Sequence, residues 1–294
     1  KMLNFYDSGN NFLGVENSSL AKSNAIIIPF GYEKTVSYGK GTSKGPEEIL
    51  KASQQLELYD EHFKCEPFET ILPLTLKKPS IPKKEADGLI KLKRIVEEVL
   101  SLNKFPLTLG GEHTITSACI EALLKKEKSL TILQFDAHAD LRNSYENNHY
   151  SHACAMRRCL DNKNIDLISI GVRSMSKYEA SYCNNNKKRI TSFLAQDIDK
   201  WNLNKLERKL KDKKLYITFD IDAFDSSLMP ATGTPEPGGL FWNDVVKVLE
   251  VASRSSKIYG ADICELSPIK SMHSCNFLAA KLAYKILSYS LLKN

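Results

Sequence analysis

The sequence predicts an α/β fold of three layers, with helices covering both faces of a mostly parallel central sheet. Short apolar runs that are strand-like alternate along the chain with longer segments of helical periodicity. Such alternation is typical of a parallel sheet with helices on both of its faces. The 294 residues, 42% of them hydrophobic, are enough to bury a large core. We therefore expect a single domain over residues 1–294, with residues 1–24 as an N-terminal extension of it.

Six short apolar runs are the expected strands. They span residues 25–29, 105–109, 130–135, 165–170, 215–219 and 257–261. Residues 62–84 are richer in proline and lysine, so we expect an irregular passage or an edge strand there. Residues 230–239 are expected to form a loop at the functional site, because the apolar pattern resumes directly after them.

Several of the segments between these runs carry helix signals. Pro46 can begin a helix over residues 47–59, because proline is tolerated in the first helical turn. Residues 85–102 place five apolar side chains at near-helical spacing, and residues 243–253 and 279–292 show a similar pattern. These four segments are the predicted helices.

Three potential metal ligands directly follow the predicted strand at residues 130–135. Asp136, His138 and Asp140 are spaced two residues apart. Because alternate side chains of an extended strand point the same way, we expect these three side chains to converge on one point. A bound cation would explain why two carboxylates and an imidazole gather there.

Two other predicted strands also end in potential ligands. His113 follows the run at residues 105–109, and Asp220 and Asp222 end the run at residues 215–219. Each motif alone is more often a solvated turn or a packed histidine. Ligands in open α/β sheets collect at the carboxyl ends of the strands, however, so the three motifs together favour a metal site. Two imidazoles and four carboxylates suit two ions, and hard oxygen ligands without a thiolate suit Mn²⁺ better than a structural zinc.

With these motifs the chain resembles the ureohydrolases, a family that includes the arginases and the agmatinases. The resemblance covers residues from about 25 to the C-terminus. It rests on three metal motifs in the family's order and on two further segments, residues 110–113, 136–140, 220–225, 41–49 and 230–240. The resemblance implies an arginase-like α/β/α fold and a hydrolase with two Mn²⁺ ions that cleaves a guanidinium group and releases urea.

The residues permit this chemistry independently of the resemblance. The carbon of a guanidinium group is a poor electrophile, so water must attack it as hydroxide. Two metal ions can supply a bridging hydroxide at neutral pH, because coordination lowers the pKa of bound water. We expect Asp140, a ligand beside that hydroxide, to take its proton and pass it to the departing amine.

Two further residues match the family's pattern. Residues 150–158 resemble the segment that carries a mobile acid/base histidine, which implies that His152 shuttles protons; an ordinary pKa near neutrality suits that role. Residues 263–268 resemble the stretch whose glutamate holds the guanidinium, which implies that Glu265 orients the substrate in a bidentate pair. The alternative for Glu265 is a surface carboxylate, but the strand-like run before it leads to the same sheet edge as the metal motifs.

The substrate expectation rests on segments that differ from those of the arginases. Arginases have polar residues after the Asp-x-His-x-Asp motif and acidic residues after a Gly-x-Arg stretch, and neither is evident in residues 141–146 or 171–176. These segments, and residues 234–239, resemble those of bacterial and archaeal agmatinases. The resemblance therefore implies that agmatine is hydrolysed to putrescine and urea, in polyamine biosynthesis.

Three alternatives stay open beside agmatine. Guanidinobutyrase or arginase activity would use the same metal motifs, and a non-catalytic ureohydrolase-like protein would keep the fold for binding. Asn143 stands where close relatives often have aspartate, which implies weaker affinity if that position contacts the distal amine. Glu112 likewise stands where aspartate is more frequent. No role is assigned to Glu236.

Composition limits the classes of partner. The net charge of +6 is dispersed along the chain without a nucleic-acid-binding motif, so we expect a small cationic guanidino substrate and no nucleic acid. No apolar stretch approaches the length of a membrane span, and we expect no membrane partner.

Seven cysteines without a Cys-x-x-Cys pair argue against a disulfide framework and favour a cytoplasmic location. Cys154 is expected to pack beside His152. The resemblance implies a homo-oligomer, a trimer or a hexamer.

Overall fold

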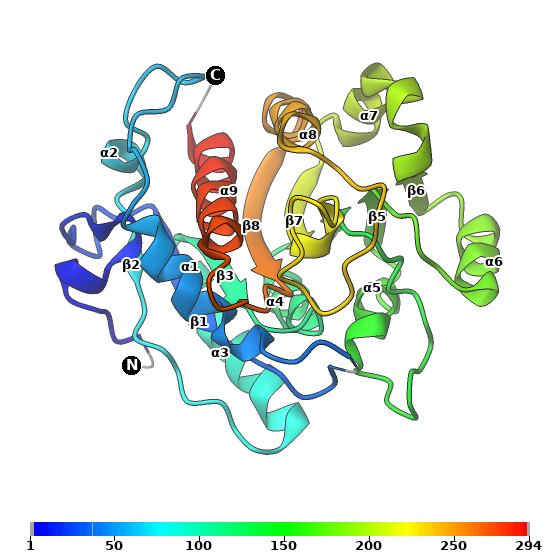
Figure 1. The fold of residues 1–294 in the computed structure, drawn as a ribbon, viewed down its shortest axis with the longest axis horizontal. Coiled ribbons are helices and arrows are strands. Elements are labelled where there is room, and N and C mark those ends of the chain that lie inside the picture. The colour runs from blue at the N-terminus through cyan, green and yellow to red at the C-terminus, as the bar shows by residue number, and fades with distance from the viewer. Residues whose placement is uncertain (1–2, 37, 293–294) are drawn as a thin grey trace.

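A parallel sheet forms the centre of the molecule (Figure 1). The computed structural model describes residues 3–36 and 38–292. In this part of the chain the sheet has eight strands in the order β2-β1-β3-β8-β7-β4-β5-β6, and every pairing is parallel. The strands are β1 (Ala25–Phe30), β2 (Leu74–Thr75), β3 (Phe105–Gly110), β4 (Leu130–Phe135), β5 (Ile165–Ile170), β6 (Ile190–Phe193), β7 (Lys214–Asp220) and β8 (Lys257–Cys264).

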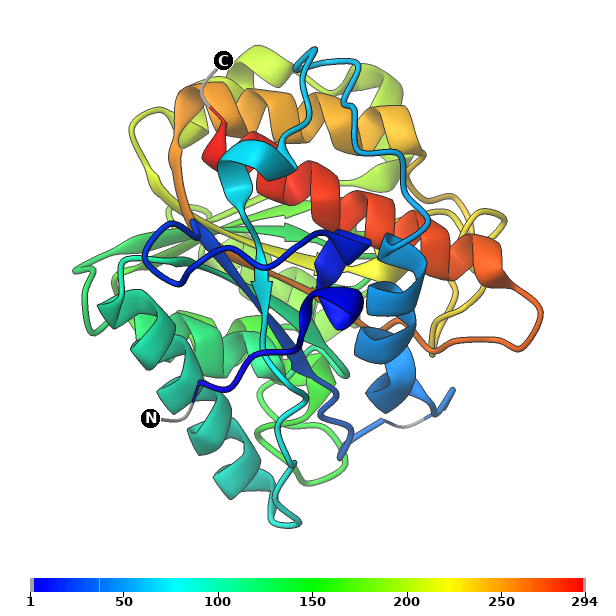
Figure 2. The same ribbon diagram turned by 90° about the vertical axis from the view of Figure 1, so that its left-hand side faces the viewer.

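Helices cover both faces of the sheet, which confirms the predicted three layers. Figure 2 shows α8 and α9, in orange and red, on one side of the strands and α3, in blue-green, on the other. The helices are α1 (Gly45–Ser53), α2 (Phe68–Ile71), α3 (Glu85–Ser101), α4 (Ile115–Leu123), α5 (Ala155–Leu160), α6 (Lys177–Asn185), α7 (Leu203–Leu210), α8 (Trp242–Ser255) and α9 (His273–Leu291).

The hydrophobic core is divided by the sheet into two clusters. Along β1, Ile27 belongs to the cluster shared with α1, α8 and α9, whereas Ile26 and Ile28 belong to the cluster shared with α3, α4 and α5. This alternation follows from the period of two in an extended strand. Because both faces are covered, the central strands are apolar at nearly every position, and this is why they could be found in the sequence.

All six predicted strands are present, and the differences concern short or irregular elements. The passage at residues 62–84 contains β2, a two-residue strand at the edge of the sheet. An edge strand was one of the two predictions for this passage. The four-residue β6 and the helices α2 and α4 to α7 were not predicted. The first helix ends at Ser53 rather than at residue 59, because the Ser53 hydroxyl bonds to Leu50 O and Leu13 N at that point. The last helix begins at His273, six residues before the predicted start.

The order of the strands decides where the candidate ligands meet. The strands β3, β8, β7 and β4 are consecutive neighbours at the middle of the sheet, and their carboxyl ends lie at one edge. The carboxyl ends of these four strands and the segments that follow them hold every residue predicted from the metal motifs, together with Glu265. In the described part of the chain, no helix combines the length and the apolar character needed to cross a bilayer.

Candidate active site

The structure brings five of the six predicted metal ligands together in two groups that share Asp136, and the sixth, Asp220, lies beside the first group. The first group is centred on His113, whose Nδ1 atom lies 3.0 to 3.4 Å from carboxylate oxygens of Asp136, Asp140 and Asp220. In the second group, the Nδ1 atom of His138 lies 2.9 Å from Asp222 Oδ2 and 3.6 Å from Asp136 Oδ1. Two groups with a common carboxylate are the arrangement expected for two neighbouring ions.

The cause of this convergence differs from the one predicted. Asp136, His138 and Asp140 do not lie on an extended strand, because β4 ends at Phe135. Instead, the backbone N–H of His138 donates to Asp136 Oδ1 at 2.6 Å, which closes a tight turn. Asp140 then adopts a left-handed conformation with φ of 53°. The two-residue spacing predicted that the three side chains converge, but a turn and not the pleat of a strand brings them together.

The segment after β7 uses the same kind of turn. Asp220 Oδ1 accepts a hydrogen bond of 2.9 Å from the backbone N–H of Asp222, which lies in a short 3₁₀ turn. Asp222 Oδ1 in turn accepts from Ala137 N at 3.0 Å. The two aspartate turns are therefore linked directly, and the relative position of the two ligand groups is determined by a hydrogen bond.

Each histidine ligand has a partner on the side of the ring that faces away from the carboxylates. His113 Nε2 lies 2.8 Å from Thr218 Oγ1, and this hydroxyl donates to Asp262 Oδ1 at 2.7 Å. The hydroxyl proton is thus directed at Asp262, so His113 Nε2 is the donor to Thr218 and Nδ1 is the ring nitrogen that faces the carboxylates. His138 Nε2 lies 3.7 Å from Glu236 Oε1, which gives Glu236 a place beside the site.

The electrostatics of the cluster favour bound cations. Burial, supported by the charge of Asp136, raises the pKa of Asp140 to about 7. Although burial alone lowers the pKa of His138, the neighbouring carboxylates, Asp222 above all, raise it to about 12. His113 Nδ1 is buried without a hydrogen-bond partner among the described residues. The crowded carboxylates need positive charge, and the donor set of carboxylate oxygens and two imidazole nitrogens fits hard divalent metal ions.

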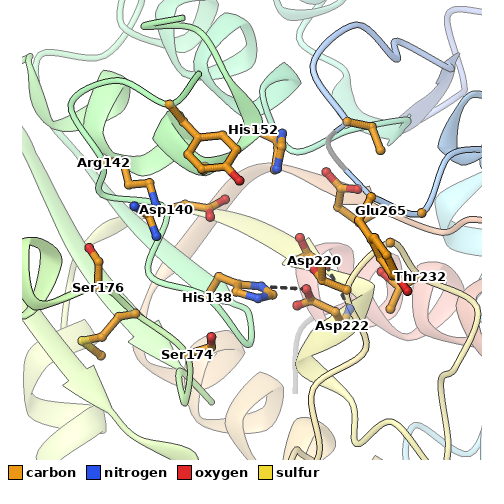
Figure 3. Close-up of a pocket in the computed structure, with 18 of the residues that line it drawn as sticks. His138, Asp140, Arg142, His152, Ser174, Ser176, Asp220, Asp222, Thr232 and Glu265 are labelled. Atoms are coloured by element: carbon orange, nitrogen blue, oxygen red, sulfur yellow. Dashed lines mark hydrogen bonds and ion pairs between the residues drawn. The ribbon is translucent and has the colours of Figure 1, made fainter. Parts of the chain in front are cut away.

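An open pocket lies over the ligand groups, and the three predicted catalytic residues, Asp140, His152 and Glu265, line it (Figure 3). Glu265 has a left-handed backbone with φ of 66°, held by a 2.7 Å hydrogen bond from its N–H to Gly111 O. Its Oε1 accepts from His113 N at 2.6 Å. Burial, with the charge of Glu112, raises the pKa of Glu265 well above its usual range, so a cationic ligand would stabilise this carboxylate.

His152 enters the pocket from the segment before α5. Burial lowers the pKa of His152 below its ordinary value, with the charges of His113 and His138 acting in the same direction. The ring is therefore neutral near pH 7. The ring of Tyr145 lies edge-on at 5.9 Å from it. Cys154 is buried near this segment, in the packing role predicted for it.

Asn143 is placed away from the pocket. Its side chain is exposed, and Oδ1 accepts a 3.0 Å hydrogen bond from Arg158 Nη2. It is not among the described residues that line the pocket. The predicted effect of Asn143 on substrate affinity depended on a contact with the distal amine, and the geometry does not favour that contact.

Arg173 is the residue of greatest consequence that sequence reasoning missed. Its guanidinium donates to backbone oxygens of the segments after β5 and β7 and of the loop at residues 234–239, namely those of Gly171, Asp222, Ala223, Phe224, Glu236 and Pro237. Gly239 permits this approach, since a Cβ there would lie 2.5 Å from Arg173 Nη2 and 2.6 Å from Asp225 N. The signal in the sequence was an arginine directly after a buried strand, without an acidic neighbour.

The geometry of the site agrees with comparisons to known proteins. The profile of the arginase family matches residues 23–288. The chain belongs to the arginase family. An N(1)-aminopropylagmatine ureohydrolase of Synechocystis sp. is 33% identical over 92% of this chain and 90% of its own length. An agmatinase of Pyrococcus horikoshii is 32% identical over 90% of this chain and 91% of its own length.

Solved structures support the same assignment. The crystal structure of the agmatine ureohydrolase of Thermoplasma volcanium matches with a TM-score of 0.81 and 30% identity, and the match covers 93% of this chain and 92% of that one. The predicted resemblance to agmatinase-like ureohydrolases is therefore confirmed. This chain is an enzyme of that hydrolase family, which is metal-dependent.

Proposed function

We propose that this enzyme hydrolyses the guanidinium group of an agmatine-type amine and releases urea, with two Mn²⁺ ions as cofactors. The observation that carries the proposal is the pair of ligand groups sharing Asp136 beneath a pocket that contains His152 and Glu265. His113, Asp136, Asp140 and Asp220 would hold one ion, and Asp136, His138 and Asp222 the other. When bound, such a pair of ions supplies hydroxide at neutral pH and neutralises developing charge.

Glu265 is the residue that would bind and orient the guanidinium. Its Oε1 is already bonded to His113 N, and this bond fixes the plane of the carboxylate against the ligand cluster. A planar carboxylate pairs well with the fork of a guanidinium group. Since Glu265 is only 8% exposed, this ion pair would form where water screens it weakly.

Asp140 and His152 would move the protons. Asp140 lines the pocket and lies 3.0 Å from His113 Nδ1, so its carboxylate could contact both a bound ion and the substrate. It would accept the proton of the attacking water and return it to the departing amine. His152, a neutral imidazole in the same pocket, would carry protons between that amine and solvent.

Two substrates of this class are favoured by specific observations. Agmatine would give putrescine and urea, and the segments at residues 141–146 and 171–176 favour it because they resemble those of agmatinases more than those of arginases. N(1)-aminopropylagmatine would give spermidine and urea, and the name of the Synechocystis relative favours it. The two compounds share the guanidinobutyl chain and differ only in the length of the cationic tail beyond it.

The test is urea release by the Mn²⁺-loaded protein from agmatine, N(1)-aminopropylagmatine, arginine and guanidinobutyrate, with a chelated sample as the control. Chelator-sensitive urea from either of the first two compounds supports the proposal, and the ratio of their kcat/KM values decides between them. A higher kcat/KM for arginine or guanidinobutyrate would overturn the substrate assignment. Absence of urea from all four would overturn the proposed function.

A further inference from the structure

Glu112 is a buried carboxylate beside the site that no step of the proposed reaction uses. Its side chain is fully buried and accepts four hydrogen bonds. Oε2 accepts from the backbone N–H groups of Lys34 at 2.8 Å and Thr35 at 2.7 Å. Oε1 accepts from the hydroxyls of Thr35 at 2.9 Å and Thr114 at 3.1 Å. Three of the four bonds therefore go to the loop after β1.

Glycine at position 111 allows this loop to lie against the end of β3. A Cβ on Gly111 would lie 2.0 Å from Tyr32 O, so no other residue fits there without movement of the backbone. The close approach lets Glu112 N donate to Tyr32 O at 2.8 Å, which turns the Glu112 side chain toward residues 34 and 35. The Gly-Gly-Glu-His segment thus presents His113 to the ligand cluster and Glu112 to the loop.

The Thr35 hydroxyl connects Glu112 to His152. Thr35 Oγ1 accepts a 3.0 Å hydrogen bond from the backbone N–H of His152 and lies 3.2 Å from His152 Nδ1. The hydroxyl of Ser151 lies farther from the same nitrogen, at 3.4 Å. Thr35 is therefore in contact with both the backbone and the ring of His152.

The directions of the hydrogen bonds around Thr35 follow from the single proton of its hydroxyl group. A threonine hydroxyl has one proton and two lone pairs. Every neighbour of the Glu112 carboxylate is a donor, and an ionised carboxylate is a stronger acceptor than an imidazole nitrogen, so the Thr35 proton is directed at Glu112. The two remaining contacts of Thr35 Oγ1 must then be donated by His152, from its backbone N–H and from Nδ1–H. This arrangement leaves Nε2 of His152 unprotonated and able to accept a proton.

We propose that Thr35 and Glu112 are positioning residues that act through His152, holding its ring in place and keeping the proton on Nδ1. The inference rests on the proposed function, because it assigns the network to the residue that shuttles protons there. The role concerns orientation only, because neither residue is among the described residues that line the pocket. The segment after β1 would thus contribute to catalysis although none of its described residues is among the proposed metal ligands.

The decisive variant is Thr35→Val, which removes the hydroxyl and keeps the shape of the side chain. We expect kcat to fall about tenfold with KM within about twofold, because proton transfer and not substrate binding is impaired. Thr35→Ser should restore most of the activity. Ser151→Ala, which removes the more distant hydroxyl beside the same nitrogen, is the matched control and should stay within about twofold of the wild type. Equal Mn²⁺ content in all variants excludes an effect through the metal ions.

Combination with His152→Ala distinguishes positioning from a general effect on the loop. If Thr35 acts through His152, Thr35→Val should lower kcat by less than about twofold further in the His152→Ala background. Glu112→Gln should behave like Thr35→Val in both backgrounds, because the amide has only one acceptor oxygen. A full tenfold loss in the His152→Ala background, or wild-type kcat for Thr35→Val, would overturn the inference.

A crystal structure of Thr35→Val tests the inference even if the proposed function fails. We expect the ring of His152 to leave its position or to occupy more than one, while in Thr35→Ser it stays in place. A wild-type protein that releases no urea from any of the four guanidino compounds would refute the proposed function alone. An unmoved His152 ring in Thr35→Val would refute the positioning role alone.

Discussion

The two histidines proposed as metal ligands have very different surroundings. His113 is 1% exposed and is supported by Thr218 and Asp262, which lie side by side on β7 and β8. His138 is 26% exposed and is supported by Glu236, which belongs to the loop at residues 234–239. His113 is therefore supported by side chains of two neighbouring strands, whereas His138 is supported by a loop that Arg173 ties to the segments after β5 and β7. We expect the first group to be the more rigid and the more strongly binding of the two.

Substitution of the shared residue, Asp136, should impair metal binding by both groups, whatever the difference in their rigidity. Asp136→Ala removes the one carboxylate common to both, so binding of both ions should fail. We expect urea release to drop by about a thousandfold or more, since two bound metal ions together supply several kcal/mol of transition-state stabilisation. Elemental analysis of the purified protein measures the metal content, and circular dichroism verifies that the variant is folded. A metal-loaded, fully active Asp136→Ala protein would contradict the assignment of the ligands.

Weakening of the loops should affect the His138 group alone. Arg173→Lys keeps the charge but cannot donate to six backbone oxygens at once. We expect the affinity for the more weakly bound ion to fall by about ten- to a hundredfold, measured as the Mn²⁺ concentration that restores activity after chelation.

A second arginine provides the matched control for this experiment. Arg189 also donates its guanidinium to backbone oxygens, those of Leu160, Asn162 and Ile165. It lies near the amino end of β5, at the opposite edge of the sheet from the site. Arg189→Lys should lower thermal stability without changing the Mn²⁺ requirement. Equal Mn²⁺ requirements for the two variants would show that Arg173 has no special relation to the ligands.

Thr218, the partner of His113, should contribute more to metal affinity than Glu236, the partner of His138. Thr218→Val removes a buried 2.8 Å hydrogen bond from His113 and leaves Nε2 without an acceptor, so we expect about a tenfold loss of affinity for the ion in that group. Glu236→Gln changes a partner that is 3.7 Å from His138 Nε2 and 35% exposed, so its loss should be about threefold or less. Isothermal titration with Mn²⁺ measures both values. The reverse order of effects would refute the proposed rigidity of the His113 group.

How much of this site could be predicted from the sequence depends on the distance between interacting residues along the chain. The spacing of Asp136, His138 and Asp140 is local, and their position after an apolar strand was enough to identify them. Arg173 and its partner Glu236 are 63 residues apart, and Thr35 and His152 are 117 residues apart. Their contacts follow from the order of the strands, which the apolar pattern alone does not specify. The short β6 was missed for a different reason, because four residues carry too little periodicity.

Substitution of Asn143 should have the smallest effect of these variants, and it tests whether residue 143 contacts the substrate. The sequence alone assigned it a possible effect on the distal amine of the substrate, whereas the structure pairs its side chain with Arg158 at the surface. Asn143→Asp would convert that hydrogen bond into an exposed ion pair, worth about 0 to 1 kcal/mol. We therefore expect kcat/KM for agmatine to stay within about twofold of the wild type, measured by urea release at low substrate concentration. An increase of tenfold or more would mean that residue 143 faces the substrate during catalysis and that the loop moves on binding.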